Sequence, residues 1–332
     1  RSRRAAYRAA VSYDPRVMTI VPTDPLRAAE ELRDRFRAGA AERDRTRSFP
    51  YEQVAALKVS GLAALRVPAE HGGSGGDTRL MHRVTATIAE GDPNVAQMLH
   101  IHLLGVEMIR THANITEQAR NAYFRRIVEQ QHLLTNAYSE LGTKTVDRFT
   151  LRFAHDDTAG GWRIAGRKFY CTGSLGGELA YVVGVTDEAE PRALLAFVDT
   201  DSPGLVIHED WSGMGQRTTA SGTMEFVDVL VPDERVCDVG FLSPESLQGG
   251  LSQLLFASIM VGIAQFQDAS RTATSPHATW PMTSSDSGVR PTSITATADG
   301  ERGPEAELGG MRTSTNVGKH SSSRGKTVDL PR

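Results

Sequence analysis

Hydrophobic positions recur with helical spacing through the segment Asp24 to Gln131. Asp24 supplies a capping carboxylate, and the next residue is a proline at a position where no amide hydrogen is needed. The first apolar face consists of Leu26, Ala29, Leu32, Phe36 and Ala40. Further helical patterns begin at Pro50, Asp77, Asn94 and Thr116. These five helices, without strands between them, predict an all-α domain over 24–131.

The pattern changes at His132, where short runs rich in β-branched residues alternate with Gly, Asp and Pro. Trp162 and Ile164 flank Arg163, an alternation typical of a half-buried strand. The predicted strands are Leu133–Ser139, Thr150–His155, Trp162–Tyr170, Leu179–Val185, Ala193–Val198, Leu205–Ile207 and Thr223–Val231. Because no helical pattern interrupts them, they predict an antiparallel barrel or sandwich over 132–239.

A last apolar helix is predicted from Ser246 to Gln267, within a segment 240–267. From Asp268 onward the chain is dense in Ser, Thr, Pro, Gly and Arg, and its apolar residues have no period. Such a composition cannot bury enough surface to offset chain entropy, so 268–332 is predicted to be disordered. A frame shift in the coding region is the favoured explanation, and a genuine disordered tail is the alternative.

The overall fold class is therefore expected to be α+β, preceded by a disordered N-terminal extension over 1–23. The first residues are basic and lack an apolar core of the kind found in secretory signals. Read-through upstream of a start at Met18 is the favoured interpretation, and a transit peptide is the other.

The chain has 332 residues and a formal net charge of −3, which argues against a nucleic-acid partner. The sequence offers no uninterrupted apolar run of the ~18 residues that a membrane helix needs, so no membrane partner is expected. Its two cysteines, Cys171 and Cys237, are too few for a disulfide framework. A cytoplasmic location is therefore predicted.

The stretch GRKFYCTG (166–173) is the first candidate for chemistry. If it is a strand, Tyr170 and Thr172 point to one face, because alternate side chains of a strand do so. An aromatic ring beside a hydroxyl would suit a planar heteroaromatic cofactor.

Four motifs occur together in this sequence: VPAEHGGSG (67–75), TNAYSELG (135–142), GRKFYCTG (166–173) and GQRTTASGTMEFVDVLVP (215–232). In order and spacing they resemble acyl-CoA dehydrogenase-like flavoproteins, and most closely the branch of sulfur-acquisition oxidoreductases and dibenzothiophene monooxygenase. The resemblance implies a helical domain, a β-domain and a C-terminal helical bundle that also builds a homo-oligomer. Here only the first helix of that bundle matches, so the oligomer and the bundle's carboxylate base cannot be assigned to residues of this chain.

The resemblance also implies a flavin site, with FMN or FAD as cofactor. It places Thr172 at the flavin N5 edge, Tyr170 against the ring, and Tyr138 and Ser139 at the pyrimidine edge. Asn136 would lie near flavin and substrate as a catalytic residue. The alternatives are a core tyrosine for Tyr170 and a turn-capping role for Asn136 or Ser139.

A polar loop carries two further candidates for cofactor binding, Arg217 and Ser221, which the resemblance places along the cleft. A solvated hairpin is the alternative. His102 matches a histidine near the pocket and is a candidate for acid–base catalysis, whereas His100 is interpreted as structural. Two residues apart on a helix, these histidines cannot chelate one ion, so no metal site is predicted.

The function expected from the resemblance is a reduced-flavin-dependent monooxygenase that acts on a small organosulfur compound, with a flavin reductase as partner. An FAD-dependent acyl-CoA dehydrogenase is the alternative. A second alternative is an inactive truncated fragment of such an enzyme.

Overall fold

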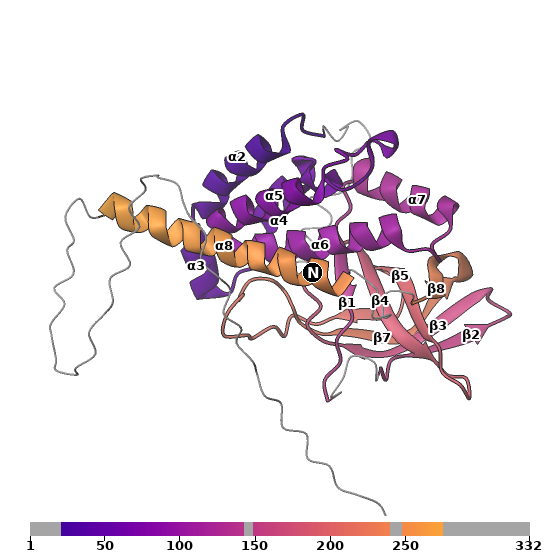
Figure 1. Ribbon diagram of the computed structural model, residues 1–332. Coiled ribbons are helices and arrows are strands. Elements are labelled where there is room, and N and C mark those ends of the chain that lie inside the picture. The colour runs from indigo at the N-terminus through magenta and orange to yellow at the C-terminus, as the bar shows by residue number, and fades with distance from the viewer. Residues whose placement is uncertain (1–20, 143–148, 240–247, 275–332) are drawn as a thin grey trace, which may run out of the picture. The chain divides into compact units, whose positions relative to one another are not determined.

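The computed structural model describes residues 21–142, 149–239 and 248–274. In this part of the chain a layer of helices lies on a β-sheet (Figure 1). The helices are α2 (Pro25–Arg37), α3 (Ala40–Thr46), α4 (Tyr51–Val59), α5 (Thr78–Gly91), α6 (Pro93–Thr111), α7 (Glu117–Val128) and α8 (Gln248–Thr274), with short 3-10 turns at Leu62–Ala64, Ala69–His71 and Asp233–Arg235.

Helix starts follow the capping residues. The carboxylate of Asp24 accepts a hydrogen bond from the Arg27 amide, Asp77 accepts one from Leu80, and Thr116 accepts one from Ala119. Each side chain satisfies an amide that the helix leaves without a partner. Helix α6 begins one residue earlier than predicted, because Asp92 caps it. The sequence pattern missed α3, a short polar helix with no buried residue.

The strands are β1 (Leu134–Ala137), β2 (Arg152–Asp156), β3 (Gly161–Lys168), β4 (Leu179–Thr186), β5 (Ala193–Asp199), β6 (Leu205–Ile207), β7 (Met224–Pro232) and β8 (Val236–Asp238). They form a sheet in the order β6-β7-β3-β2-β4-β5-β8, with β1 also paired to β4. Strand β8, which pairs with β5, is too short for its alternation to have been recognised.

The α+β class is confirmed, and the sheet is mixed rather than antiparallel throughout. Strand β4 pairs in parallel with β1 along Leu179–Val182 and with β2 at Val185 and Thr186. Strands β1 and β2 therefore follow one another along the same edge of β4. Hairpins join strands that are close in sequence, and such pairs are antiparallel. Neither β1 nor β2 reaches β4 by a hairpin, which is why strand spacing did not predict these two pairings.

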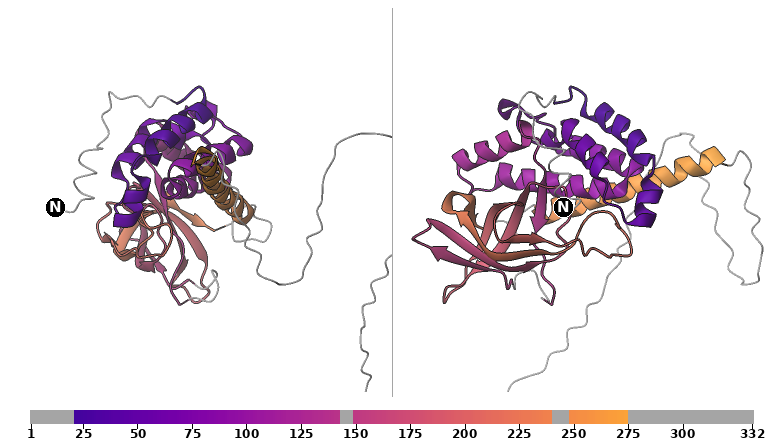
Figure 2. Two further views of the ribbon diagram at one scale, coloured as in Figure 1. Left: turned by 90° about the vertical axis from the view of Figure 1, so that its left-hand side faces the viewer. Right: turned by 180° about the vertical axis from the view of Figure 1, so that it is seen from behind.

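Strand β4 is buried on both faces. Tyr181 and Val183 belong to the core shared with the helices, whereas Ala180 and Val182 belong to a second core with β3 and β7. The helices cover one face of the sheet, as the views from the side and from behind also show (Figure 2). Helix α6 approaches closely at Gly105, where an added Cβ would lie 2.7 Å from Leu134 and 3.0 Å from Tyr181.

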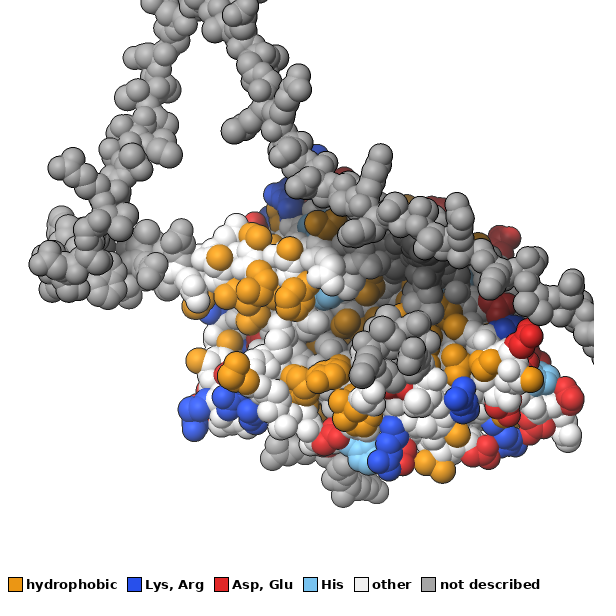
Figure 3. Space-filling view, turned by 60° about the horizontal axis from the view of Figure 1, so that its bottom comes forward, with side chains coloured by type: hydrophobic (Ala, Val, Ile, Leu, Met, Phe, Trp, Pro, Cys, Tyr) orange, Lys and Arg blue, Asp and Glu red, His pale blue; other side chains and the backbone are white. Residues whose placement is uncertain are grey.

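Helix α8 continues to Thr274, beyond the predicted end at Gln267, so 268–274 is helical rather than disordered. Leu255 and Ile259 are fully buried in the helical core. Other apolar side chains of α8 are exposed (Figure 3), and these are Leu254, Phe256, Met260, Val261 and Phe266. The predicted frame-shifted or disordered tail otherwise falls on 275–332, outside the described residues.

By length and composition, Gly249–Gln267 could cross a membrane, which differs from the prediction made from uninterrupted apolar runs. A helix that packs into a bundle has the same length and composition. Helix α8 packs against α5 and α6, as a helix of a bundle does.

Candidate active site

The ends of β1 and β3 lie side by side, as the motifs predicted. The Phe169 amide donates to the Ser139 carbonyl at 2.8 Å. Three residues away along each segment, Asn136 Oδ1 accepts a hydrogen bond from the Thr172 amide at 2.9 Å. The Nδ2 of Asn136 donates to the Tyr170 carbonyl at 3.3 Å. Asn136 thus fixes the turn that carries both Tyr170 and Thr172.

Tyr170 and Thr172 do not share a strand face, which corrects the expectation from alternation. Strand β3 ends at Lys168, and Tyr170 has φ of +56°. The chain turns there, with the Thr172 amide donating to the Tyr170 carbonyl at 2.9 Å. As a result the Tyr170 side chain is 53% exposed, whereas Thr172 is 6% exposed. The Tyr170 ring is therefore at the surface, whereas the Thr172 hydroxyl is buried.

A chain of hydroxyl groups gives Thr172 a fixed polarity. Thr219 Oγ1 donates to the Gln216 carbonyl at 2.8 Å, because a carbonyl can only accept. Its single proton is then used, so at 2.7 Å Thr219 must accept from Ser221. By the same reasoning Ser221 accepts from Thr172 at 2.8 Å. Thr172 therefore keeps only lone pairs for a ligand and acts there as an acceptor.

Backbone contacts hold this loop against the turn. The Cys171 amide donates to the Gly222 carbonyl at 3.1 Å, and the Gly173 amide donates to the Thr219 carbonyl at 2.9 Å. Thr135 Oγ1 also donates to the Thr172 carbonyl at 2.6 Å. Cys171 itself is fully buried, and burial raises the pKa of its thiol to about 12. The thiol therefore stays protonated and serves packing.

A buried ion pair that the motif analysis did not single out lies behind Ser139. Lys168 Nζ contacts Glu140 Oε1 at 2.6 Å, and both side chains are almost inaccessible. Lys168 also donates to the Tyr138 carbonyl at 3.1 Å and lies 4.3 Å from the centroid of the Phe149 ring. Burial lowers the pKa of Lys168 to about 8. The pair connects β3 to the segment that follows β1. Its only signal in the sequence was a lysine next to apolar residues in the motif GRKFYCTG.

Tyr138 and Ser139 follow β1, but they meet different surroundings. The Tyr138 ring packs edge-to-face on Phe149 with centroids 5.4 Å apart, and burial raises the pKa of its phenol to about 12. Its ring is partly buried and packs against the core, and its carbonyl accepts a hydrogen bond from Lys168. Ser139 is half-buried and holds β3 through its carbonyl.

His102 lies in the interior, away from the exposed ring of Tyr170. Its Nε2 donates to the Ala63 carbonyl at 2.7 Å, and its Nδ1 accepts from the Leu134 amide at 3.0 Å. Both nitrogens are therefore occupied by backbone groups, in the neutral tautomer that these partners require. Burial lowers the pKa of His102 to about 4, partly offset by the bond to Ala63. These contacts join α6 to β1 and leave neither ring nitrogen of His102 free for acid–base catalysis.

The buried histidines are expected to make the fold less stable in acid. Burial lowers the pKa of His100, His102 and His132 from 6.5 to about 4. The unfolded chain binds these protons near pH 6.5 and the folded chain only near pH 4. Stability is therefore full above pH 6.5 and decreases as the pH falls toward 4. Urea midpoints across this range measure the slope, and His102→Gln should reduce it; an unchanged slope would contradict the assignment.

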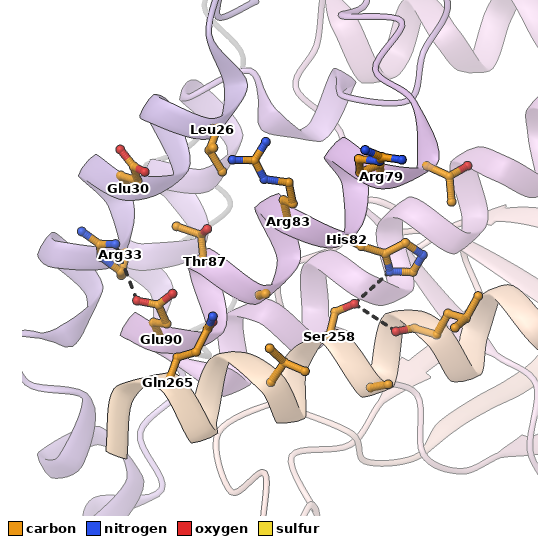
Figure 4. A pocket seen from close by; sticks show the side chains of 15 residues that line it. Leu26, Glu30, Arg33, Arg79, His82, Arg83, Thr87, Glu90, Ser258 and Gln265 are labelled. Carbon is orange, nitrogen blue, oxygen red and sulfur yellow. Dashed lines mark hydrogen bonds and ion pairs between the residues drawn. The ribbon is translucent and has the colours of Figure 1, made fainter. Parts of the chain in front are cut away.

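Arg217 and Ser221 lie on the same loop but have different neighbours. Ser221 contacts Thr172, whereas Arg217 Nε lies 3.8 Å from Asp44 in α3. Arg217 lines a cavity of about 150 Å³ between this loop and the α3–α4 connection. A larger groove of about 680 Å³ lies elsewhere, between α2, α5 and α8 (Figure 4). In the described part of the chain, no three His, Cys, Asp or Glu side chains are grouped to hold a metal ion.

Comparisons with known proteins show what the chain is similar to. Residues 27–131 match the model of the acyl-CoA dehydrogenase N-terminal domain. Dibenzothiophene monooxygenase of Rhodococcus erythropolis is 31% identical over 252 residues, which are 73% of this chain and 60% of that protein. The predicted resemblance to the acyl-CoA dehydrogenase-like superfamily is confirmed.

Two further proteins support the resemblance to the branch that the motifs indicated. The probable FMNH2-dependent monooxygenase SfnC of Pseudomonas putida is 30% identical over 254 residues, 75% of this chain and 62% of that protein. The crystal structure of FMN-bound TdsC from Paenibacillus sp. A11-2 superimposes with a TM-score of 0.70 at 26% identity, over 76% of this chain and 65% of that one. The chain thus spans about three fifths of the length of the curated relatives it matches.

Proposed function

We propose that this chain comes from a monooxygenase that uses reduced FMN to oxygenate a small organosulfur compound. The names of the relatives support this reaction class, since they include a dibenzothiophene monooxygenase and an FMNH2-dependent monooxygenase. The observation that carries the proposal here is the fixed acceptor on Thr172, which suits the reduced form of the cofactor.

The residues present fit a flavin. The exposed face of Tyr170 offers an aromatic platform, and Trp211 supports it edge-on with centroids 6.0 Å apart. Reduced flavin carries a hydrogen on N5, and the hydroxyl chain leaves Thr172 Oγ1 as an acceptor next to that platform. When bound, FMN supplies the reaction with oxygen and the transfer of one oxygen atom.

The protein's own residues then have separate tasks. Thr172 Oγ1 would accept a hydrogen bond from the N5–H group of the flavin. Ser221 and Thr219 would keep the Thr172 hydroxyl proton directed toward Ser221 and away from the flavin. Asn136 holds the turn in place through two hydrogen bonds. Tyr170 and Trp211 would cover the flavin ring and limit the access of water to it. Tyr138 and Ser139 would contribute backbone groups to the pyrimidine edge of the flavin, in the segment whose Tyr138 carbonyl Lys168 holds.

We further propose that a separate flavin reductase supplies the reduced cofactor and that the protein acts in the cytoplasm. The enzyme forms a homo-oligomer through a C-terminal helical bundle.

A rapid-mixing experiment tests the proposed function. Reduced FMN mixed with oxygen and the protein should release hydrogen peroxide more slowly than free reduced FMN does, because the site protects the cofactor from water. With an organic sulfide present, labelled oxygen should appear in the product. Peroxide release at the rate of free flavin, or bleaching of bound flavin by an acyl-CoA without oxygen, would contradict the proposal. The second result would favour an acyl-CoA dehydrogenase.

A further inference from the structure

The loop beside the hydroxyl chain contains an unusual run of polar atoms without partners. Arg217 Nε and Thr218 Oγ1 are buried, and no group in the described part of the chain forms a hydrogen bond with them. Thr218 as a whole is 2% exposed. A buried polar group without a partner costs ~1–3 kcal/mol, so consecutive ones indicate that something else binds them.

The backbone on both sides of this run is in the left-handed region. Gln216 has φ of +52° and Ala220 has φ of +48°. Such conformations cost ~1–3 kcal/mol for residues other than glycine, and they are concentrated at ligand-binding sites. Trp211 Nε1 and Thr219 Oγ1 both donate to the Gln216 carbonyl, at 2.7 and 2.8 Å, and hold this backbone in place.

Arg217 and Thr218 line the cavity of about 150 Å³ together with Arg47, from the α3–α4 connection. Arg47 uses Nη1 to donate to the Gly213 carbonyl at 3.0 Å, one of the five N–H donors of a guanidinium. Arg217 Nε is 3.8 Å from Asp44, too far for a hydrogen bond. Two guanidinium groups and a hydroxyl thus face a space with few acceptors.

Acidic groups near the cavity leave hydrogen-bonding capacity on these donors. The Asp44 carboxylate, 3.8 Å from Arg217 Nε, balances part of its charge but accepts no hydrogen bond from it. Glu209 lines the cavity but is exposed to solvent. His208, a further lining residue, is engaged by Glu225 at 3.1 Å. A water molecule takes ~30 Å³ of liquid volume, so the cavity accommodates a group of a few heavy atoms and not a tricyclic ring.

We propose that this cavity binds a small tetrahedral oxyanion, the phosphate or sulfonate group of a ligand, through Arg47, Arg217 and Thr218. Planar guanidinium groups match the paired oxygens of such anions, and the Thr218 hydroxyl adds a donor. The anion could be part of the flavin phosphate or of an anionic organosulfur compound. Binding of the anion itself does not depend on the proposed flavin chemistry.

Calorimetric titration with inorganic phosphate, sulfate and methanesulfonate tests the proposal without flavin. One anion per chain should bind, and Arg47→Gln and Arg217→Gln should each weaken binding about tenfold. Thr218→Val, which keeps the shape of the side chain, should weaken it about fivefold. The control Arg192→Gln removes an exposed guanidinium paired with Glu188 and should bind as the wild type does.

A second pair of titrations distinguishes the source of the anion. If the site takes the cofactor phosphate, Arg217→Gln should weaken FMN but not riboflavin. If it takes an anionic substrate, FMN should be unaffected while methanesulfonate is weakened. The proposal is wrong if the wild type binds none of the three anions at millimolar concentration, or if the correctly folded Arg47 and Arg217 variants bind them as tightly as the wild type. Circular dichroism establishes that each variant is folded.

Discussion

Replacing Lys168 with methionine should lower the free energy of unfolding by about 3–5 kcal/mol, because the change leaves the Glu140 carboxylate buried without its cation. Burial by itself raises the pKa of Glu140, whereas hydrogen bonds from Lys168 and Thr150 bring it below its usual range. Without Lys168, Glu140 keeps the hydrogen bonds from Thr150 and Leu151 but loses the 2.6 Å ion pair. Urea unfolding at neutral pH measures the difference.

Two controls separate this effect from a general loss of charge. The double variant Lys168→Met/Glu140→Leu should recover much of the stability, because neither charge is then left alone. Arg192→Met breaks an exposed pair with Glu188 and should cost less than about 1 kcal/mol. If Lys168→Met and Arg192→Met were equally mild, the pair would not contribute as its burial implies.

Replacing Ser221 with alanine should make the reduction potential of bound FMN more negative by about 30 mV. Without Ser221, the Thr172 proton is no longer held away from the ligand, so the site loses its preference for the N5 hydrogen of reduced flavin. A neutral hydrogen bond is worth about 1.4 kcal/mol near the upper end of its usual range, which is a tenfold change in relative affinity and about 30 mV for a two-electron couple. Weaker binding of the reduced form moves the potential downward.

Spectroelectrochemical titration of the flavin–protein complex measures this shift. Thr172→Val should give a shift in the same direction, and Thr172→Ser should restore the wild-type potential. Ser174→Ala provides a matched control, since Ser174 donates to the Ala220 carbonyl at 2.8 Å in the same loop but lies outside the hydroxyl chain. A potential that stays at the wild-type value in Ser221→Ala, or that rises, would mean that the chain of hydroxyls does not set the polarity of Thr172.

Local signals predicted much of this fold. Capping carboxylates at Asp24 and Asp77 marked helix starts because the cap is made within three residues of the chain. Alternation located most strands for the same reason. The parallel neighbours of β4 depend on pairing between distant segments, and no local pattern encodes them.

The proximity of the two candidate segments follows from the resemblance, whereas their geometry does not. The motifs brought Asn136 and Thr172 together correctly, although 36 positions separate them. The left-handed backbone of Tyr170 was not foreseen, because tyrosine seldom adopts it and the alternation rule assumes an extended strand. The direction of the hydroxyl protons follows from four groups on two loops, of which Thr172 and Ser221 are 49 positions apart. Such a network becomes visible only in three dimensions.

The packing of α8 against α5 limits where the chain can be truncated for expression. Gly262 lies so close to the Ala86 carbonyl that a Cβ at this position would overlap it. Although α8 follows the sheet in the chain, Leu255 and Ile259 complete the hydrophobic interior of the helices that precede the sheet. A shortened expression clone that ends after β8 would therefore uncover α5 and α6, and a useful cloning boundary must lie beyond α8.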